Sequence, residues 1–364
     1  MTQMVTLIPR TLDLRAGEWV QVRNKEEILS TLDKNGRLDE LPFMPEMFEY
    51  CGRRLQVFKR AHKTCDPVNG LGGRRMEDTV HLQDIRCDGA AHGGCQAGCL
   101  IFWKESWLKR EGDKSDTAMG RPLPGACSEQ DILAGTRERG EAPNPAELPY
   151  ICQATRVSYA TQPLAWWDPR QYVKDYTSGN VRISEMISSF LFVIYHGIAS
   201  AGLGFGTAMR WLYDMFQKMR GGVPYPLRTG KVPKGQRTPS AKLDLQPGEF
   251  VRVKSYAEIL ETLDETWRNR GMHFDAEMVP YCGQTFRVLK RVERIIDEKT
   301  GKMLHLKNDA IILEGVVCQA FYAKCRKFCP RSYYQYCREI WLERVSDAPV
   351  QAAKEQGQAA TVSA

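Results

Sequence analysis

The cysteine spacing recurs in the two halves of the chain, and this recurrence constrains the fold more than any other feature. Each half carries a set of three: Cys87, Cys95 and Cys99 in the first, and Cys318, Cys325 and Cys329 in the second. The first set reads C-x7-C-x3-C and the second reads C-x6-C-x3-C. Because unrelated cysteines would not recur in register, the two sets indicate a shared structural demand. The simplest such demand is a soft metal held once in each half.

The similarity between the halves extends well beyond the cysteines. The segment DLRAGEWVQV at 13–22 corresponds to DLQPGEFVRV at 244–253, so the copies are 231 positions apart. A chain of 364 residues suits about two domains. The sequence therefore predicts two modules of one fold, the first at 1–110 and the second at 244–345.

The rest of the chain divides by composition into connecting and terminal segments. We expect an irregular connector at 111–182, an apolar helical segment at 183–220, a basic Pro/Gly linker at 221–243 and a disordered tail at 346–364. The first part of the connector is rich in Gly, Pro, Asp and Glu, and Gly, Pro and Asp favour turns. The tail is small and polar, so it offers little apolar surface to bury.

The sequence of each module predicts an α+β fold, and we expect the two copies to be joined by helices. Trp19–Val22 alternates in the manner of a strand. Asn24 precedes Glu27 by three positions, which is the spacing of a capping box at a helix start. Short alternating strands follow, which favours a small curved antiparallel barrel, similar in architecture alone to SH3-like barrels. We expect each module to close with a helix that carries its last cysteines, at 95–110 and 325–345.

The predicted ligands of a metal in each module are the clustered cysteines. Two side chains four positions apart share one helix face, so two thiolates would converge on one zinc ion. A structural zinc needs a fourth ligand, and the matched candidates are Cys51 and Cys282. The alternatives are His81 and His305, or Cys65 in the first module alone. An iron–sulfur cluster and a site without metal stay open, because the spacing matches no common zinc knuckle.

The first cluster also offers a candidate nucleophile. Gly93 and Gly94 allow a tight turn before Cys95, which would lie near a helix N-terminus, where the pKa of a thiol is lowered. His92 would serve as its base. The second copy has neither the histidine nor the glycines in front of its cysteine. A catalytic Cys95–His92 pair would therefore exist in one copy only, which favours a protein that is not an enzyme.

The cysteine content and the N-terminus predict a cytoplasmic protein. The chain has 12 cysteines and begins without the apolar core or cleavage motif of a secretory signal. In a reducing compartment, clustered cysteines are more often ligands or catalytic groups than disulfides.

An uncharged segment in the middle of the chain raises the question of a membrane. Met186–Met209 is long enough to span a bilayer, but its glycines and serines argue against a simple span. Between Met215 and Leu243 there are seven basic residues and no acid. An apolar helix beside a polybasic stretch is typical of an anionic membrane surface. Residues 186–243 therefore predict either a buried helical hairpin or peripheral contact with such a surface.

These patterns favour a metal-stabilised binding or scaffold protein with a protein partner, such as a membrane-bound biosynthetic one. The principal alternative is an enzyme or electron-transfer protein that uses an iron–sulfur site or a reactive cysteine. A second alternative is a nucleic-acid binder that uses SH3-like barrels and the basic linker. Nucleic acid is the less favoured partner, because the charge outside the linker is balanced.

Overall fold

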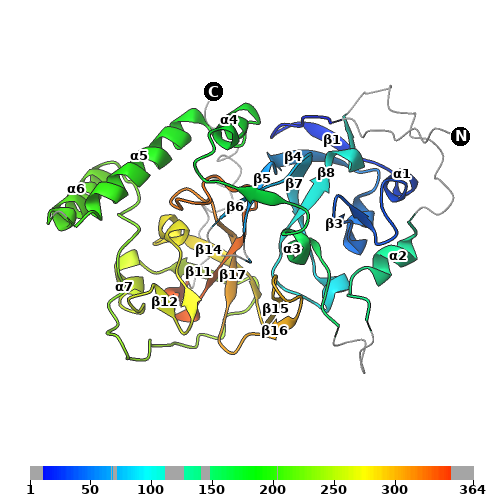
Figure 1. The fold of residues 1–364 in the computed structure, drawn as a ribbon. Helices are drawn as coiled ribbons and strands as arrows, with labels where there is room; N and C mark the ends of the chain where they lie inside the picture. Colours follow the sequence, from blue (N-terminus) through cyan, green and yellow to red (C-terminus); the bar gives the residue numbers. More distant parts are fainter. Residues whose placement is uncertain are drawn as a thin grey trace, which may run out of the picture. The chain divides into compact units, whose positions relative to one another are not determined.

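The computed structural model describes residues 11–66, 68, 72–110, 127–140, 148–202 and 204–345 (Figure 1). The predicted disordered tail at 346–364 lies outside these residues. The chain forms two compact units. Unit 1 comprises Met1–Ser189, Arg294–Leu304 and Lys324–Ser332, and unit 2 comprises Phe190–Glu293, His305–Ala323 and Tyr333–Ala364.

Each module contains a five-stranded antiparallel sheet, and the two sheets have the same topology. The first has the order β8-β7-β4-β1-β9, with the strands Leu100–Lys104, Thr79–Arg86, Arg54–Arg60, Trp19–Val22 and Leu108–Arg110. The second has the order β18-β17-β14-β11-β19, with the strands Tyr334–Cys337, Ile311–Val317, Thr285–Arg291, Phe250–Val253 and Leu342–Arg344. Both sheets are curled, because the register shifts where β4 pairs with β7 and where β14 pairs with β17. The predicted duplication of a curled α+β module is confirmed.

A short helix follows the first strand of each module. In the first module, α1 (Lys25–Leu29) has a capping box in which Asn24 and Glu27 each accept a backbone N–H of the other. In the second, α7 (Tyr256–Leu260) is capped in the same way by Ser255 and Glu258. These reciprocal bonds satisfy backbone donors that a helix start otherwise leaves unpaired.

The prediction that a helix carries the last cysteines of each module is wrong. Residues 100–110 form β8, the short 3-10 helix η3 (Glu105–Trp107) and β9, and the second copy repeats this with β18, η7 (Glu339–Trp341) and β19. The cysteines themselves precede these strands in irregular backbone. Gly98 has a φ of 61°, which an α-helix does not accommodate. The apolar run Leu100–Lys104 pairs with β7 and is buried along its whole length, so its lack of a strict alternation resembled a helix.

Matched side chains close the core of each module. Trp107 packs against Phe43 with ring centroids 5.2 Å apart, and its indole N–H donates to Thr31. Trp341 packs against Phe274 at 5.2 Å and donates to Thr262. A buried glutamate beside each tryptophan accepts three consecutive backbone N–H groups at the module entrance: Glu105 from Leu12, Asp13 and Leu14, and Glu339 from Leu243, Asp244 and Leu245. The duplication therefore extends to individual hydrogen bonds.

The connector contains more regular structure than expected. Its helices are α2 (Glu129–Ala134), α3 (Gln153–Arg156) and α4 (Arg170–Thr177), and its strand β10 (Gln162–Leu164) pairs with β6 (Gly73–Arg75), which pairs with β5 (Lys63–Cys65). The next helices are α5 (Ile183–Ala199) and α6 (Gly206–Met219). Within the described residues, none of the helices has both the length and the apolar character needed to cross a membrane.

Short elements complete the fold. They are β2 (Arg37–Leu38), β3 (Leu41–Pro42), η1 (Pro45–Tyr50), η2 (Ala90–His92), β12 (Arg268–Asn269), β13 (Met272–His273), η6 (Ala276–Tyr281), β15 (Arg294–Ile296) and β16 (Met303–His305). Two of them, η1 and η2, supply residues of the site described next.

Candidate metal centre

Three side chains of unit 1 meet in a way that suits a metal ion. The ligand atoms of Glu46, Cys87 and His92 all lie within 4.8 Å of one another. Glu46 comes from η1, Cys87 directly follows β7, and His92 ends η2. Among the residues that the structure describes, this is the one group of three or more potential ligands that converges so closely.

Glu46 is a buried carboxylate without a hydrogen-bond partner. Its side chain is 8% exposed, and among the described residues neither carboxylate oxygen has a partner of good hydrogen-bond geometry, the Cys87 thiol being its polar neighbour. Pro45 begins η1 and Met47 packs into the core, so the short helix holds Glu46 facing the interior. Burying an unpaired carboxylate costs several kcal/mol, so an atom in this position calls for a counterion.

His92 presents a lone pair to this carboxylate. The imidazole is 1% exposed, and its Nε2 lies 3.1 Å from the carbonyl oxygen of Ile151. That contact requires Nε2 to carry the proton, which leaves Nδ1 as the atom with the lone pair. Nδ1 has no hydrogen-bond partner among the described residues and lies 3.8 Å from Oε1 of Glu46. A metal-bound histidine characteristically donates its second N–H to a carbonyl in this manner.

The spacing of these atoms fits a small cation better than a hydrogen bond. Two ligands about 2 Å from a tetrahedral zinc lie roughly 3.3 Å apart. The Nδ1–Oε1 distance of 3.8 Å is beyond a hydrogen bond and close to that ligand spacing. A movement of a few tenths of an ångström would bring both atoms to an ion.

A tight turn sets the position of His92. The backbone N–H groups of His92 and Gly94 both donate to the carbonyl of Gly89, at 2.9 Å each. Gly89 has a φ of 77°, and a Cβ there would overlap the carbonyl oxygen of Cys95. Only glycine therefore permits this turn, which carries the chain from Cys87 back over the end of the sheet.

Cys87 is a neutral thiol in these surroundings. Burial raises the pKa of Cys87 far above its ordinary value, and the neighbouring Glu46 carboxylate raises it further. Burial also lowers the pKa of His92, although Glu46 opposes that change. A bound dication would reverse the first effect, because a coordinating thiol loses its proton. Metal binding at this site would therefore release the thiol proton of Cys87.

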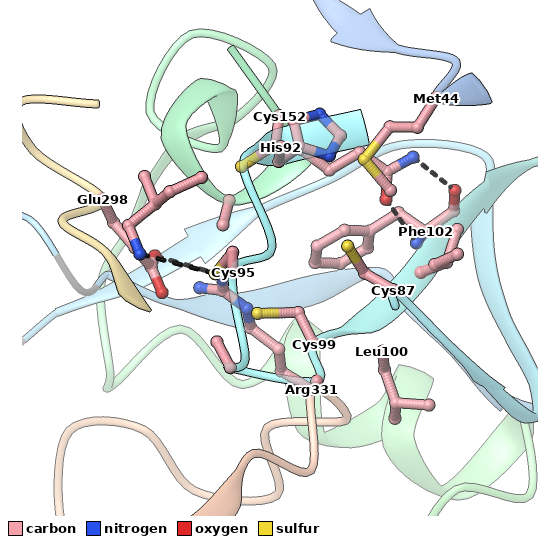
Figure 2. Close-up of a pocket in the computed structure, with 16 residues that line it drawn as sticks. Met44, Cys87, His92, Cys95, Cys99, Leu100, Phe102, Cys152, Glu298 and Arg331 are labelled. Carbon is pink, nitrogen blue, oxygen red and sulfur yellow. Dashed lines mark hydrogen bonds and ion pairs between the residues drawn. The ribbon is translucent and has the colours of Figure 1, made fainter. Parts of the chain in front are cut away.

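A small pocket adjoins the three residues and is lined by further sulfur atoms. Figure 2 shows the lining cysteines around it, with His92 at one side: Cys87, Cys95, Cys99 and Cys152. The cavity volume is about 40 Å³, which is room for roughly three water molecules. Burial raises the pKa of Cys99 to about 12 and that of Cys152 to about 11. At the edge of the pocket, Arg331 and Glu298 form an ion pair at 3.0 Å.

The three cysteines of the predicted first cluster line one pocket, but their sulfur atoms do not all lie within 4.8 Å of one another, and the proposed fourth ligands lie elsewhere. Cys87, Cys95 and Cys99 line one pocket, whereas Cys51 ends η1 and packs at the rim of the core. His81 is fully buried elsewhere in the sheet, with Nδ1 2.9 Å from the carbonyl of Ile101. Burial lowers the pKa of His81 to about 3.

The second cluster is arranged differently. Cys318 belongs to unit 2, while Cys325 and Cys329 belong to unit 1. There, Sγ of Cys329 accepts the backbone N–H of Cys65 at 3.1 Å. Cys282 ends η6, as Cys51 ends η1, and burial raises the pKa of Cys282 to about 12. His305 is exposed at the end of β16.

Sequence reasoning missed Glu46 and Cys152, and it considered His92 only as a base. Glu46 was detectable in principle, because it stands 231 positions before Glu277 and is therefore a charged residue shared by both copies. Cys152 carried no such signal, since it lies in the connector and has no matched partner.

No protein-family model matches the chain, and no curated protein is significantly similar to it.

Proposed function

We propose that the chain is a metal-stabilised binding protein in which unit 1 holds one zinc ion through Glu46, Cys87 and His92. The observation that carries this proposal is the unpaired Nδ1 of His92, which faces the unpaired carboxylate of Glu46 within reach of the Cys87 sulfur. Two buried polar groups without partners beside a thiol form an expensive arrangement unless a cation joins them.

The ligand types support zinc. Carboxylate oxygen, imidazole nitrogen and thiolate sulfur are the three donors that zinc accepts in proteins, and it requires no particular geometry from d-electrons. Calcium and magnesium bind oxygen, and neither would use Cys87. The fourth ligand would come from the thiols of the adjoining pocket. Cys99 and Cys152 are the candidates, because both influence the pKa of Cys87 electrostatically.

The size of the pocket supports a structural role. A cavity of about 40 Å³ admits an ion and its water but not an organic substrate. With four protein ligands, a zinc site is closed to substrate, and its free energy of binding becomes free energy of folding. On this proposal the metal holds η1, the loop after β7 and the start of α3 together, and the protein acts by binding a partner.

The test is elemental analysis of the purified full chain with matched histidine variants. We expect about one zinc per chain in the wild type and none in His92→Ala. His81→Ala is the control, because it removes an equally buried imidazole that also bonds a backbone carbonyl but belongs to no group of converging ligand atoms among the described residues. It should retain zinc despite a loss of stability. Equal zinc contents in the two variants, or a wild type that binds no metal after reconstitution, would contradict the proposal.

The fourth ligand is tested in the same assay. Cys152→Ser and Cys99→Ser should each be compared with Cys51→Ser, which alters a cysteine outside the pocket. The variant that loses zinc affinity identifies the ligand. If Cys51→Ser lost zinc and both others kept it, the proposed ligand set would be wrong.

An iron–sulfur cluster is the second candidate, and one observation favours it. Four cysteines line the same pocket, which is the number of thiolates that an iron–sulfur cluster takes, and the cavity would have to widen to hold one. Protein purified without oxygen would then be brown and would contain iron and sulfide. A colourless protein that contains zinc alone would exclude the cluster.

A further inference from the structure

The C-terminal half of α5 and the whole of α6 form a helical hairpin in unit 2 that exposes large apolar side chains. On α5, Leu191 and Ile194 are each 60% exposed and Ile198 is 46% exposed. Their separations of three and four positions place them on one face of the helix. Phe192 and Ala199 of the same helix are instead buried.

The exposed face continues on α6. Its apolar side chains follow helical spacing and are open to solvent: Trp211 at 61%, Leu212 at 47%, Met215 at 43%, Phe216 at 48% and Met219 at 72%. No residue of α6 is fully buried. Soluble proteins seldom leave a contiguous patch of this kind uncovered, so the surface indicates an interaction.

The opposite faces of the two helices are packed together, so the exposure is not a sign of an undocked hairpin. Tyr213 contacts Phe192 and Tyr195, with ring centroids 6.0 and 5.6 Å apart. The hydroxyl of Tyr195 donates to the carbonyl of Met209. Tyr225, which is fully buried, packs against Phe192 and Tyr213 from the following segment. The hairpin is therefore anchored by its inner face while its outer face stays free.

Positive charge adjoins this outer face. Lys218 and Arg220 are exposed at the end of α6, and the guanidinium of Arg220 lies 5.3 Å from the ring centre of Phe216. Asp214, the one acidic residue of α6, pairs with Arg228. The segment that follows adds Lys234 and Arg237, both exposed, and no acid before Asp244.

We propose that this hairpin binds the surface of an anionic membrane, with its apolar side chains among the acyl chains and its cations at the lipid headgroups. Aromatic, leucine and methionine residues flanked by Lys and Arg are the composition of an interfacial helix. A second copy of the chain is a poorer occupant, because the hairpin offers the cations Lys218 and Arg220 but no acidic residue other than Asp214, which is already paired, to complement them. Neither helix is long enough to cross the bilayer, so the contact is peripheral.

The test is co-sedimentation of the full chain with vesicles of phosphatidylcholine mixed with phosphatidylserine, and with vesicles of phosphatidylcholine alone. We expect binding to the anionic vesicles that falls with added salt. Trp211→Ser combined with Met215→Ser should abolish sedimentation. Leu133→Ser is the matched control, because it replaces an equally exposed apolar residue on α2 and should bind as the wild type does.

The charge contribution is tested separately. Lys218→Glu combined with Arg220→Glu should weaken binding to the anionic vesicles by more than tenfold, at about fivefold for each cation removed. All four substituted positions of the hairpin are exposed, and unchanged thermal unfolding will show that the variants fold. The proposal is overturned if the wild type sediments with neither vesicle, or if the Trp211→Ser, Met215→Ser variant binds normally. It is also overturned if these substitutions instead abolish a dimer seen without lipid.

Discussion

The two modules share a buried glutamate, but each gives it a different set of partners. In the first module, Glu46 accepts no backbone N–H from the part of the chain that the structure describes, and it faces His92. In the second, Glu277 accepts the backbone N–H groups of Phe321, Tyr322 and Ala323, at 3.0, 2.6 and 3.3 Å. The second copy therefore satisfies its carboxylate with backbone dipoles, whereas the first leaves it available to a cation.

The difference arises in the loop that follows β7 in the first module and β17 in the second. In the first module this loop turns at Gly89 and directs the side chain of His92 inward. In the second module it is one residue shorter between the first two cysteines, and it turns its backbone N–H groups inward instead. Burial raises the pKa of Glu277, and these backbone donors oppose that rise. The glutamates beside the closing tryptophans, Glu105 and Glu339, are satisfied alike in both copies. The two copies therefore agree at this glutamate and differ at the one in the candidate site.

Removal of metal should have the largest effect and should be confined to the first module. A ligand present at a thousand times its dissociation constant stabilises the folded state by about 4 kcal/mol. We expect a chelator to lower the free energy of unfolding of unit 1 by that order. Hydrogen exchange should show lost amide protection near Cys87 and none near Cys318. An equal loss of amide protection near Cys87 and near Cys318 would mean that the two modules do not differ in their dependence on metal.

Glu277→Ala should be the next most damaging change. It leaves three partly buried backbone donors without their acceptor, at a cost of roughly 3 kcal/mol. This loss should be the same with and without chelator. Glu46→Ala, by contrast, should be less stable than the wild type when both are measured with zinc. Without zinc, the two proteins should be about equally stable. Denaturant unfolding of both variants, with zinc and with chelator, measures these losses of stability. If the loss caused by Glu277→Ala also depended on chelator, the proposed difference between the two glutamates would be wrong.

Cys99 and Cys329 occupy equivalent positions in the two cysteine sets, but their contributions to stability should depend differently on pH. A hydrogen bond from the Cys65 thiol lowers the pKa of Cys329 to about 6, and the nearby Arg331 guanidinium contributes. Burial raises the pKa of Cys99 to about 12. A lowered pKa in the folded state adds stability that is complete above the ordinary thiol pKa and is lost as the pH falls towards 6.

Wild type and Cys329→Ser should therefore differ most near pH 9 and progressively less towards pH 6, by on the order of 2 kcal/mol over that window. Chemical unfolding at several pH values measures this difference. A stability gap that is constant with pH would show that Cys329 is not held as a thiolate. Cys99→Ser in the presence of chelator supplies the comparison, since its neutral thiol should give no such trend below pH 9.

The helix caps should show the smallest effect and no difference between the modules. Asn24→Ala and Ser255→Ala each remove the side chain of an equivalent capping box, and each should cost about 1 kcal/mol. Thermal unfolding of the two variants is the measurement. Unequal losses would show that the modules already differ outside the loop that carries His92.

Local patterns in the sequence were sufficient to predict much of the fold. The capping residues Asn24 and Ser255 were identified correctly, because a capping box involves residues only three positions apart. The duplication was also evident, and the two sheets confirm it. The helix expected at 95–110 was wrong because burial on both sides of β8 removes the alternation that marks a strand.

The candidate site depended on contacts that no local pattern encodes. The sequence by itself determined that two copies of one curled module exist and that each carries a cysteine set. Only the tertiary structure decided that Glu46 meets His92, that Cys152 enters from the connector, and that Cys329 turns to Cys65, 264 positions away. The physical reason is that short-range hydrogen bonds and side-chain periodicity are properties of neighbouring residues. Convergence on one ion instead depends on how the loops between strands are turned, which single residues such as Gly89 control.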